Sequence, residues 1–193
     1  MDETWIHYYT PESREGSKQW LEPGGSAPKR SKTQQTAGKV IASVFWDSHG
    51  IIFIDYLENR KTITGAYYAA LLDRLADEMK KKRPHLQKKK ILFYDDNAPS
   101  HASIISQAKK HQLGFEMVPH PPYSPDLAPS DYYLFPNLKR WLCGKRFESN
   151  DEVKLETEAY FEGLEKSFYL NGIEKLKDRY TRCIELNGEY VEK

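Results

Sequence analysis

The alternation of apolar and polar positions over residues 1–57 predicts three strands. Residues 4–10 (TWIHYYT) are β-branched and aromatic, and they stop at Pro11. Residues 40–46 and 50–57 have the same character, and the short segment DSHG between them is typical of a hairpin connection. Residues 10–39, in contrast, are rich in Pro, Gly, Ser, Thr and Lys. A loop of this length in a compact domain is usually functional or disordered.

The period of the pattern changes after residue 60. Apolar residues at offsets of three and four describe one helical stripe over residues 64–82, with Thr64 as the N-cap and Pro84 beyond its end. The continuous apolar run KILFY at residues 90–94 predicts a strand that is buried on both faces. The remaining pattern predicts a helix over 100–111 that stops at Gly114, a strand over 115–118, a helix over 130–143, and two helices between 151 and 190 that break near Asn171-Gly172.

The order of these elements, β-β-β-α-β-α-β-α-α, favours an α/β fold. Three antiparallel strands followed by two crossover strands form a mixed sheet that is flanked by helices. This is the ribonuclease H-like arrangement, expected as a single domain over residues 1–193. Residues 10–39 are then an insertion into that domain.

The composition supports a folded domain and excludes few functions. Of the residues, 39% are hydrophobic and 13% are aromatic, which is too much core-forming material for a disordered chain. The net charge of +1 neither indicates nor excludes a nucleic-acid partner. Cys143 and Cys183 fit no metal-binding spacing, so we expect a reducing intracellular compartment. Neither a membrane protein nor a secreted precursor is expected, because the sequence has no long apolar run and no leader-like start.

Three aspartates occupy positions where such a sheet places ligand sites. Asp96 directly follows the buried strand, at its carboxyl end. Asp2 lies at the head of the first strand, and Asp131 lies at a predicted helix start, where the helix dipole favours an anion. Carboxylates from three elements could converge on one or two Mg²⁺ ions and promote attack at phosphorus. The pattern alone leaves a simpler interpretation open, in which Asp131 belongs to a helix end and Asp96 to a turn.

Two segments around these aspartates resemble the signature blocks of mariner transposases. They are residues 91–101, ILFYDDNAPSH, and residues 118–135, VPHPPYSPDLAPSDYYLF. The 34 residues between Asp96 and Asp131 match the spacing of that family. Shorter matches occur in DETWI at 2–6, in GKRF at 144–147 and in RCIELNGEY at 182–190. The resemblance covers essentially the whole chain, and it extends to the mariner part of a fusion with a SET methyltransferase domain.

The resemblance implies a metal-dependent DNA transposase. It assigns Asp2, Asp96 and Asp131 as the catalytic residues that bind Mg²⁺ or Mn²⁺, as two ions. Such enzymes cut DNA at the inverted repeats of a transposon and join the released 3′ end to a TA target. The resemblance also implies a homodimer in the DNA complex, a nuclear location, and a clamp-like loop at residues 10–39.

The chain departs from the family pattern at two positions. Asp95 stands where family members commonly carry His before the second catalytic aspartate. Strand alternation would point Asp95 away from Asp96, although the extra anion could raise the pKa of its neighbour. Met1 stands where the family has Gly, and the earlier half of the first strand and the helix-turn-helix units do not precede it in this sequence. We therefore expect an N-terminally truncated domain that folds but cleaves DNA poorly, because terminal residues such as Asp2 fray.

Candidate DNA contacts are more scattered along the chain. The basic runs at 80–83 and 88–90 suit a nuclear signal or a phosphate-binding patch, and equally a solvated helix end. The histidines of the matching blocks are expected to orient or pack rather than to bind metal, and Asp126 is expected to shape a turn. The candidate DNA-contacting residues are Trp20, Lys88, Lys89, His101, His120, Lys145 and Arg146.

Two other functions are compatible with the sequence. A catalytically impaired remnant of a transposase could act as a DNA-binding or dimerisation module. A general nuclease of the ribonuclease H class is less well supported, because the proline-rich block resembles mariner transposases specifically. The presence of all three aspartates favours an enzyme.

Overall fold

The computed structural model describes residues 1–11, 36–57, 61–87 and 89–191. Most of the predicted loop insertion, residues 12–35, lies outside the described residues. The division into one domain with a clamp-like insertion therefore stays a prediction, and so does any role of Trp20 and Lys88.

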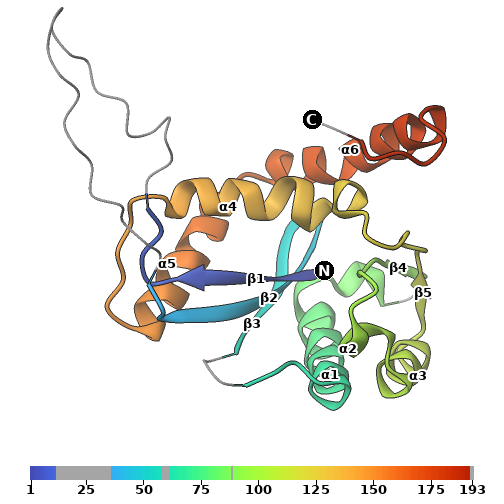
Figure 1. The fold of residues 1–193 in the computed structure, drawn as a ribbon. Coiled ribbons are helices and arrows are strands. Elements are labelled where there is room, and N and C mark those ends of the chain that lie inside the picture. Colours follow the sequence, from blue (N-terminus) through green and yellow to red (C-terminus); the bar gives the residue numbers. More distant parts are fainter. Residues whose placement is uncertain (12–35, 58–60, 88, 192–193) are drawn as a thin grey trace, which may run out of the picture.

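The strands form two hydrogen-bonded ladders (Figure 1). The first ladder is antiparallel and has the order β1 (Asp2–His7), β2 (Lys39–Asp47) and β3 (Gly50–Leu57). The second is a parallel pair of β4 (Ile91–Phe93) and β5 (Phe115–Met117). The predicted class, a mixed α/β fold with three antiparallel strands and then two crossover strands, is confirmed. Its strands hydrogen-bond in two groups where one continuous sheet was expected.

The two ladders meet at the beginning of β1. Asp2 pairs with Val44 of β2, and on the other side the backbone nitrogen of Met1 donates a hydrogen bond to the carbonyl oxygen of Tyr94 at 2.6 Å. Tyr94 directly follows β4, so this bond places the start of β1 beside the end of β4. The short matching segment at residues 2–6 is thereby brought beside the signature segment at residues 91–101.

Helix α1 (Gly65–Lys82) covers one face of the antiparallel ladder and packs against α3 (Ile104–Gln112). It begins as predicted, because the side chain of Thr64 accepts a hydrogen bond from the Tyr67 backbone nitrogen at 3.2 Å. A short 3-10 turn over Pro84–Leu86 follows it. The core between these helices and the strands consists of Phe45, Ile52, Tyr68, Leu71, Leu72, Leu75, Met79, Phe93 and Phe115.

Helices α4 (Phe135–Leu142), α5 (Asn150–Glu162) and α6 (Lys166–Glu185) lie on the other side of the ladder (Figure 1). Alternate residues of β2 point into this second core, which consists of Ile6, Val40, Ala42, Val44, Leu134, Phe135, Leu138, Leu142, Phe147, Val153, Phe161 and Tyr169. Strand β2 therefore contributes to both cores, as expected for a strand covered by helices on each face. Within the described residues, no helix has the length and apolarity needed to cross a membrane.

The predicted helix break near Asn171-Gly172 is wrong. Helix α6 runs through that site, and the interruption falls earlier, between the end of α5 and Lys166. Glycine is present at 172 because the helix crosses other side chains closely: a Cβ atom there would lie 2.5 Å from Cδ1 of Tyr133 and 3.2 Å from Cη2 of Trp46. A packing requirement, and not a turn, explains this glycine.

Two other predicted helices are more irregular than the pattern indicates. The helix over 100–111 is divided into α2 (Pro99–Ala102) and α3, because the side chain of Ser103 caps α3 by accepting from the Ser106 nitrogen at 3.2 Å. The helix over 130–143 opens with a π-helical turn, Ser130–Leu134, before α4 begins. Both irregularities lie beside candidate site residues.

Candidate active site

The three candidate aspartates come from three separate elements. Asp2 begins β1 and is buried, Asp96 follows β4 and is half-buried, and Asp131 lies in the π-helical turn and is exposed. The bond from Met1 to Tyr94 brings the first two elements together, and the last lies close enough for its charge to act on both carboxylates. The structure thus places residues that are 129 positions apart in the sequence at one site.

Asp2 and Asp131 perturb one another strongly. Burial and the charge of Asp131 raise the pKa of Asp2 to about 8, although the Glu3 backbone nitrogen donates to its carboxylate at 2.7 Å. Although Asp131 reaches solvent, the surrounding protein removes part of the hydration of its carboxylate and, with the charge of Asp96, raises its pKa; a hydrogen bond with Asp2 offsets part of that effect. Two carboxyl groups that resist ionisation together are typical of sites that share a proton or a cation.

Asp96 has a different environment, because His101 holds its carboxylate. Nδ1 of His101 lies 2.6 Å from Oδ1 of Asp96, and the Ala98 backbone nitrogen donates to the same oxygen at 3.0 Å. Burial would raise the pKa of Asp96, but these two hydrogen bonds hold it below its ordinary value. Asp96 is therefore the carboxylate that stays ionised most readily.

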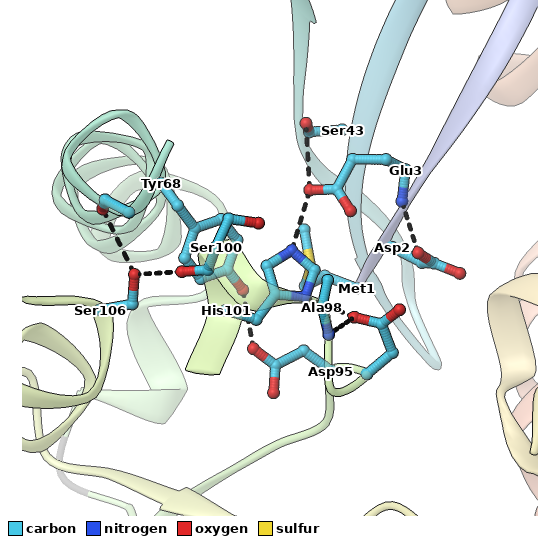
Figure 2. A network of polar contacts seen from close by, with 12 residues as sticks. Met1, Asp2, Glu3, Ser43, Tyr68, Asp95, Ala98, Ser100, His101 and Ser106 are labelled. Carbon is cyan, nitrogen blue, oxygen red and sulfur yellow. Dashed lines mark hydrogen bonds and ion pairs between the residues drawn. The ribbon is translucent and has the colours of Figure 1, made fainter. Parts of the chain in front are cut away.

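His101 is buried and bridges two carboxylates. Its Nε2 atom lies 3.1 Å from Oε1 of Glu3, and only 1% of its side-chain surface is exposed. Figure 2 shows the imidazole between Glu3 and the segment that carries Asp95 and Ala98. Burial opposes protonation of the ring, but hydrogen bonds to Asp96 and Glu3 outweigh it and raise the pKa of His101 to about 9. His101 therefore orients the carboxylate of Asp96, which agrees with the expected orienting role. Because its side chain is buried, its ring is not accessible to DNA, and it is not a DNA contact in this structure.

Asp95 does not act on Asp96 in the way that its charge suggested. Its carboxylate accepts a hydrogen bond from the Tyr68 hydroxyl at 2.9 Å and pairs with Nζ of Lys110 at 2.5 Å. Burial would raise the pKa of Asp96, but the hydrogen bonds from His101 and Ala98 outweigh burial and lower it, so the rise that a neighbouring anion could cause is not found. The carboxylate of Asp95 is instead paired with the buried ammonium of Lys110.

A cavity of about 370 Å³ opens beside Asp2, Asp95 and Asp96. Most of its surface is apolar and comes from β2, α1, β4 and α6, with Phe45, Leu75 and Phe93 among the lining residues. Its walls place the carboxylates at the edge of a low-dielectric space. Such an environment strengthens electrostatic interactions with the carboxylates.

The donor chemistry of the aspartates suits a hard divalent cation. Carboxylate oxygens are the ligands that Mg²⁺ and Mn²⁺ prefer, and a cation beside Asp2 would offset the burial and the negative charge of Asp131 that raise the pKa of Asp2. In the part of the chain that the structure describes, however, no three His, Cys, Asp or Glu side chains are already arranged to hold a metal ion. One oxygen of Asp96 is taken up by His101, so coordination by all three aspartates would require side-chain adjustment.

The other candidate DNA contacts are distributed over separate surfaces. Lys89 is exposed, and His120 bonds through Nδ1 to the Tyr94 hydroxyl at 2.7 Å near the site. Lys145 lies 3.3 Å from the centre of the Trp141 ring, and Arg146 lies over the ring of Tyr9 at 4.5 Å. These last two cations are held against aromatic rings within the domain.

Several residues near the site were not singled out by the sequence. Glu3 contacts His101, and Lys110 pairs with Asp95. The sequence pattern offered no signal that would have identified either residue.

Tyr123 lies in the proline-rich segment. It combines a positive φ of 53°, which is strained for a residue other than glycine, with 99% exposure. Asp126 has the structural role that was expected, because it is buried and accepts from the Val191 nitrogen at 2.8 Å.

The sequence matches one known protein family and two known proteins. The family model described as Transposase (partial DDE domain) matches residues 10–89. Over 99% of its length the chain is 35% identical to the Mariner Mos1 transposase of Drosophila mauritiana. It is 33% identical, again over 99% of its length, to the histone-lysine N-methyltransferase SETMAR of Homo sapiens. The chain spans 55% of the first protein and 28% of the second.

Solved structures give the same result at the level of the fold. The Mos1 mariner paired end complex with Mn matches with a TM-score of 0.91 at 35% identity, over 99% of this chain and 55% of that chain. The paired end complex with Mg matches with a TM-score of 0.90 at 34% identity, over 99% and 55% of the two chains. The catalytic domain of Mos1 mariner transposase matches with a TM-score of 0.81 at 33% identity, over 99% of this chain and 82% of that one.

Proposed function

Because the chain belongs to the mariner transposase family, we propose that it is a metal-dependent catalytic domain that cuts DNA at transposon ends and joins the 3′ ends to a TA target. The observation that carries this proposal is that Asp2 and Asp96 line one cavity, while Asp131 lies close enough to interact with both of their carboxylates. Their roles as catalytic residues and metal ligands are part of the proposal.

The three aspartates would hold Mg²⁺ or Mn²⁺, as two ions. When bound, such ions stabilise charge on the attacking and leaving oxygens of a phosphoryl transfer. The residues of this chain prepare the ligands: His101 fixes the Asp96 carboxylate, and the Glu3 backbone nitrogen fixes that of Asp2. The solved Mos1 paired end complexes with Mn and with Mg support this choice of cation.

Transposon-end DNA is the partner that we propose for this site. The support is that the related Mos1 structures are paired end complexes, and that exposed lysines such as Lys89 lie on the described surface. We extend the proposal to a homodimer in the DNA complex and to a nuclear location, which the basic runs at 80–83 and 88–90 would favour. Sedimentation with and without DNA tests the first point, and the distribution of a fluorescent fusion tests the second.

The decisive experiment is metal-dependent nicking of supercoiled DNA by the purified chain. We expect weak nicking with Mn²⁺ that disappears in EDTA and in the Asp96→Asn variant, while Asp73→Asn on α1 retains it. Nicking that survives in Asp96→Asn would refute the assignment. Inactivity of both this chain and a version extended by an N-terminal DNA-binding part would favour the alternative, a catalytically impaired DNA-binding or dimerisation module.

A further inference from the structure

The least expected feature beside the site is a fully buried lysine. The side chain of Lys110 on α3 is 1% exposed, and its partner Asp95 is 4% exposed. Burying both charges carries a large cost in solvation, so the pair is weak evidence for a purely stabilising role. The contacts of the pair indicate what else it does.

Lys110 contacts the same residue that holds Asp96. Its Nζ atom donates to the carbonyl oxygen of His101 at 3.1 Å while it pairs with Oδ2 of Asp95 at 2.5 Å. Gln107 also donates to that carbonyl, at 3.2 Å. Two side chains of α3 therefore anchor the backbone of His101, while its ring contacts the carboxylates of Asp96 and Glu3.

Asp95 and Tyr68 complete the support of the imidazole. The Tyr68 hydroxyl donates to Oδ2 of Asp95 at 2.9 Å, and the Tyr68 ring lies 4.2 Å from that of His101, centre to centre. Lys110 also lies over the Tyr68 ring, at 5.5 Å. Figure 2 shows Tyr68, Asp95 and His101 close to one another.

We propose that Lys110 and Asp95 form a positioning pair for Asp96, acting through His101. The pair holds the backbone and the ring of His101 in position. His101 in turn orients the Asp96 carboxylate through the hydrogen bond to Oδ1. The inference rests on the proposed function only for the consequence for cleavage, since the effect on His101 is measurable in the protein alone. Groups that orient a ligand carboxylate or imidazole typically affect metal affinity or activity about 10–100-fold.

The test uses a double variant, Asp95→Asn with Lys110→Met, which removes both charges at similar volume. Replacing both members of a buried pair is often neutral for stability, whereas removing one leaves an uncompensated charge. A matched control is Asp73→Asn with Lys109→Met, because that pair likewise joins an aspartate to a lysine of α3, at 3.0 Å, but its aspartate belongs to α1. Thermal unfolding of both double variants establishes that they are folded.

The first measurement is the exchange of the His101 Nδ1 proton with solvent, followed by ¹⁵N–¹H correlation spectra without metal or DNA. We expect a protected proton in the unchanged chain and in the control, and about tenfold faster exchange in the Asp95→Asn/Lys110→Met variant. Equal protection in all three proteins would overturn the proposal. This readout does not depend on cleavage, so it separates failure of the positioning pair from failure of the proposed function.

Two further measurements extend the test. Mn²⁺ alone should bind about tenfold more weakly to the Asp95→Asn/Lys110→Met variant, and nicking should fall in kcat while KM for DNA is unchanged. If the double variant does not fold, the exchange of the Lys110 ammonium protons with solvent is measured in the unchanged chain. We expect these protons to exchange far more slowly than those of Lys109, and equal exchange rates would overturn the proposal.

Discussion

The Nδ1 atom of His101 lies 2.6 Å from Asp96, while the Nε2 atom of the same ring lies 3.1 Å from Glu3. Asp96 follows the parallel pair of strands, and Glu3 belongs to the antiparallel ladder. One imidazole therefore links the two ladders at the point where the aspartates gather. Its protonation state affects both the fold and the site.

The first prediction concerns pH and His101. Because its pKa is raised to about 9, protonation stabilises the folded state fully below the unfolded value of about 6.5, and this contribution is lost as the pH rises through 9. We expect the urea midpoint of the unchanged chain to fall over this window more steeply than that of His101→Gln. Parallel curves for the two proteins would contradict the assigned protonation.

The second prediction concerns Asp2 and divalent cations. A carboxyl group whose folded pKa is raised to about 8 stabilises the fold only at low pH, and that contribution is lost as the pH rises from about 3.8 through 8. Asp2→Asn should therefore unfold at a higher temperature than the unchanged chain at pH 8 in EDTA. Mn²⁺ should raise the Tm of the unchanged chain and remove this difference. A Tm that is the same in Mn²⁺ and in EDTA would argue against cation binding at Asp2.

The third prediction concerns the close helix crossing at Gly172. A methyl group there would meet the Tyr133 ring at 2.5 Å, so Gly172→Ala should lower the free energy of unfolding by about 1–3 kcal/mol despite the better helix propensity of alanine. Gly163→Ala is the matched control, because its nearest neighbour is a carbonyl oxygen at an ordinary 3.4 Å. Urea titration of both variants distinguishes packing from propensity. Equal stability of the two would show that Tyr133 moves aside without cost.

The fourth prediction concerns DNA affinity and Lys89. This exposed lysine has room to contact a phosphate, and each such contact contributes about 0.9 to the slope of log affinity against log salt. Lys89→Ala should weaken binding to all duplexes alike and reduce the slope by about one. Lys89→Arg, which keeps the charge, should leave the slope unchanged. An unaltered slope in Lys89→Ala would remove this residue from the interface.

Local patterns were sufficient for most elements of the fold. The strand pairing, the cap at Thr64 and the placement of Asp96 after a strand all follow from alternation and capping preferences between near neighbours. The prediction that this strand is buried on both faces is wrong, because Leu92 of β4 is 68% exposed. The helix break predicted at Gly172 was wrong because glycine is needed there for close packing against the side chain of Tyr133, 39 positions earlier in the chain. Propensity contains no information about such a contact.

The support around the aspartates could not be predicted for the same reason. Glu3 and His101 are 98 residues apart, and the burial of Lys110 depends on α3 lying against α1. A lysine in a basic helix is ordinarily solvated, so its type gave no reason to place it in the interior. The sequence identified Asp95 as a departure from the family pattern, but its pairing with Lys110 could be found only in the structure.

The π-helical turn at Ser130–Leu134 has a geometric consequence for Asp131. The Phe135 nitrogen bonds to the Ser130 carbonyl across this wider turn, and α4 beyond it is anchored in the core by Leu138. Each residue of an α-helix advances the side-chain direction by about 100°, so a chain shorter by one residue here would rotate Asp131 around the axis by that angle. The additional residue therefore sets the rotation of the Asp131 carboxylate relative to the anchored helix α4. At this position the number of residues, more than their chemistry, decides where the third aspartate points.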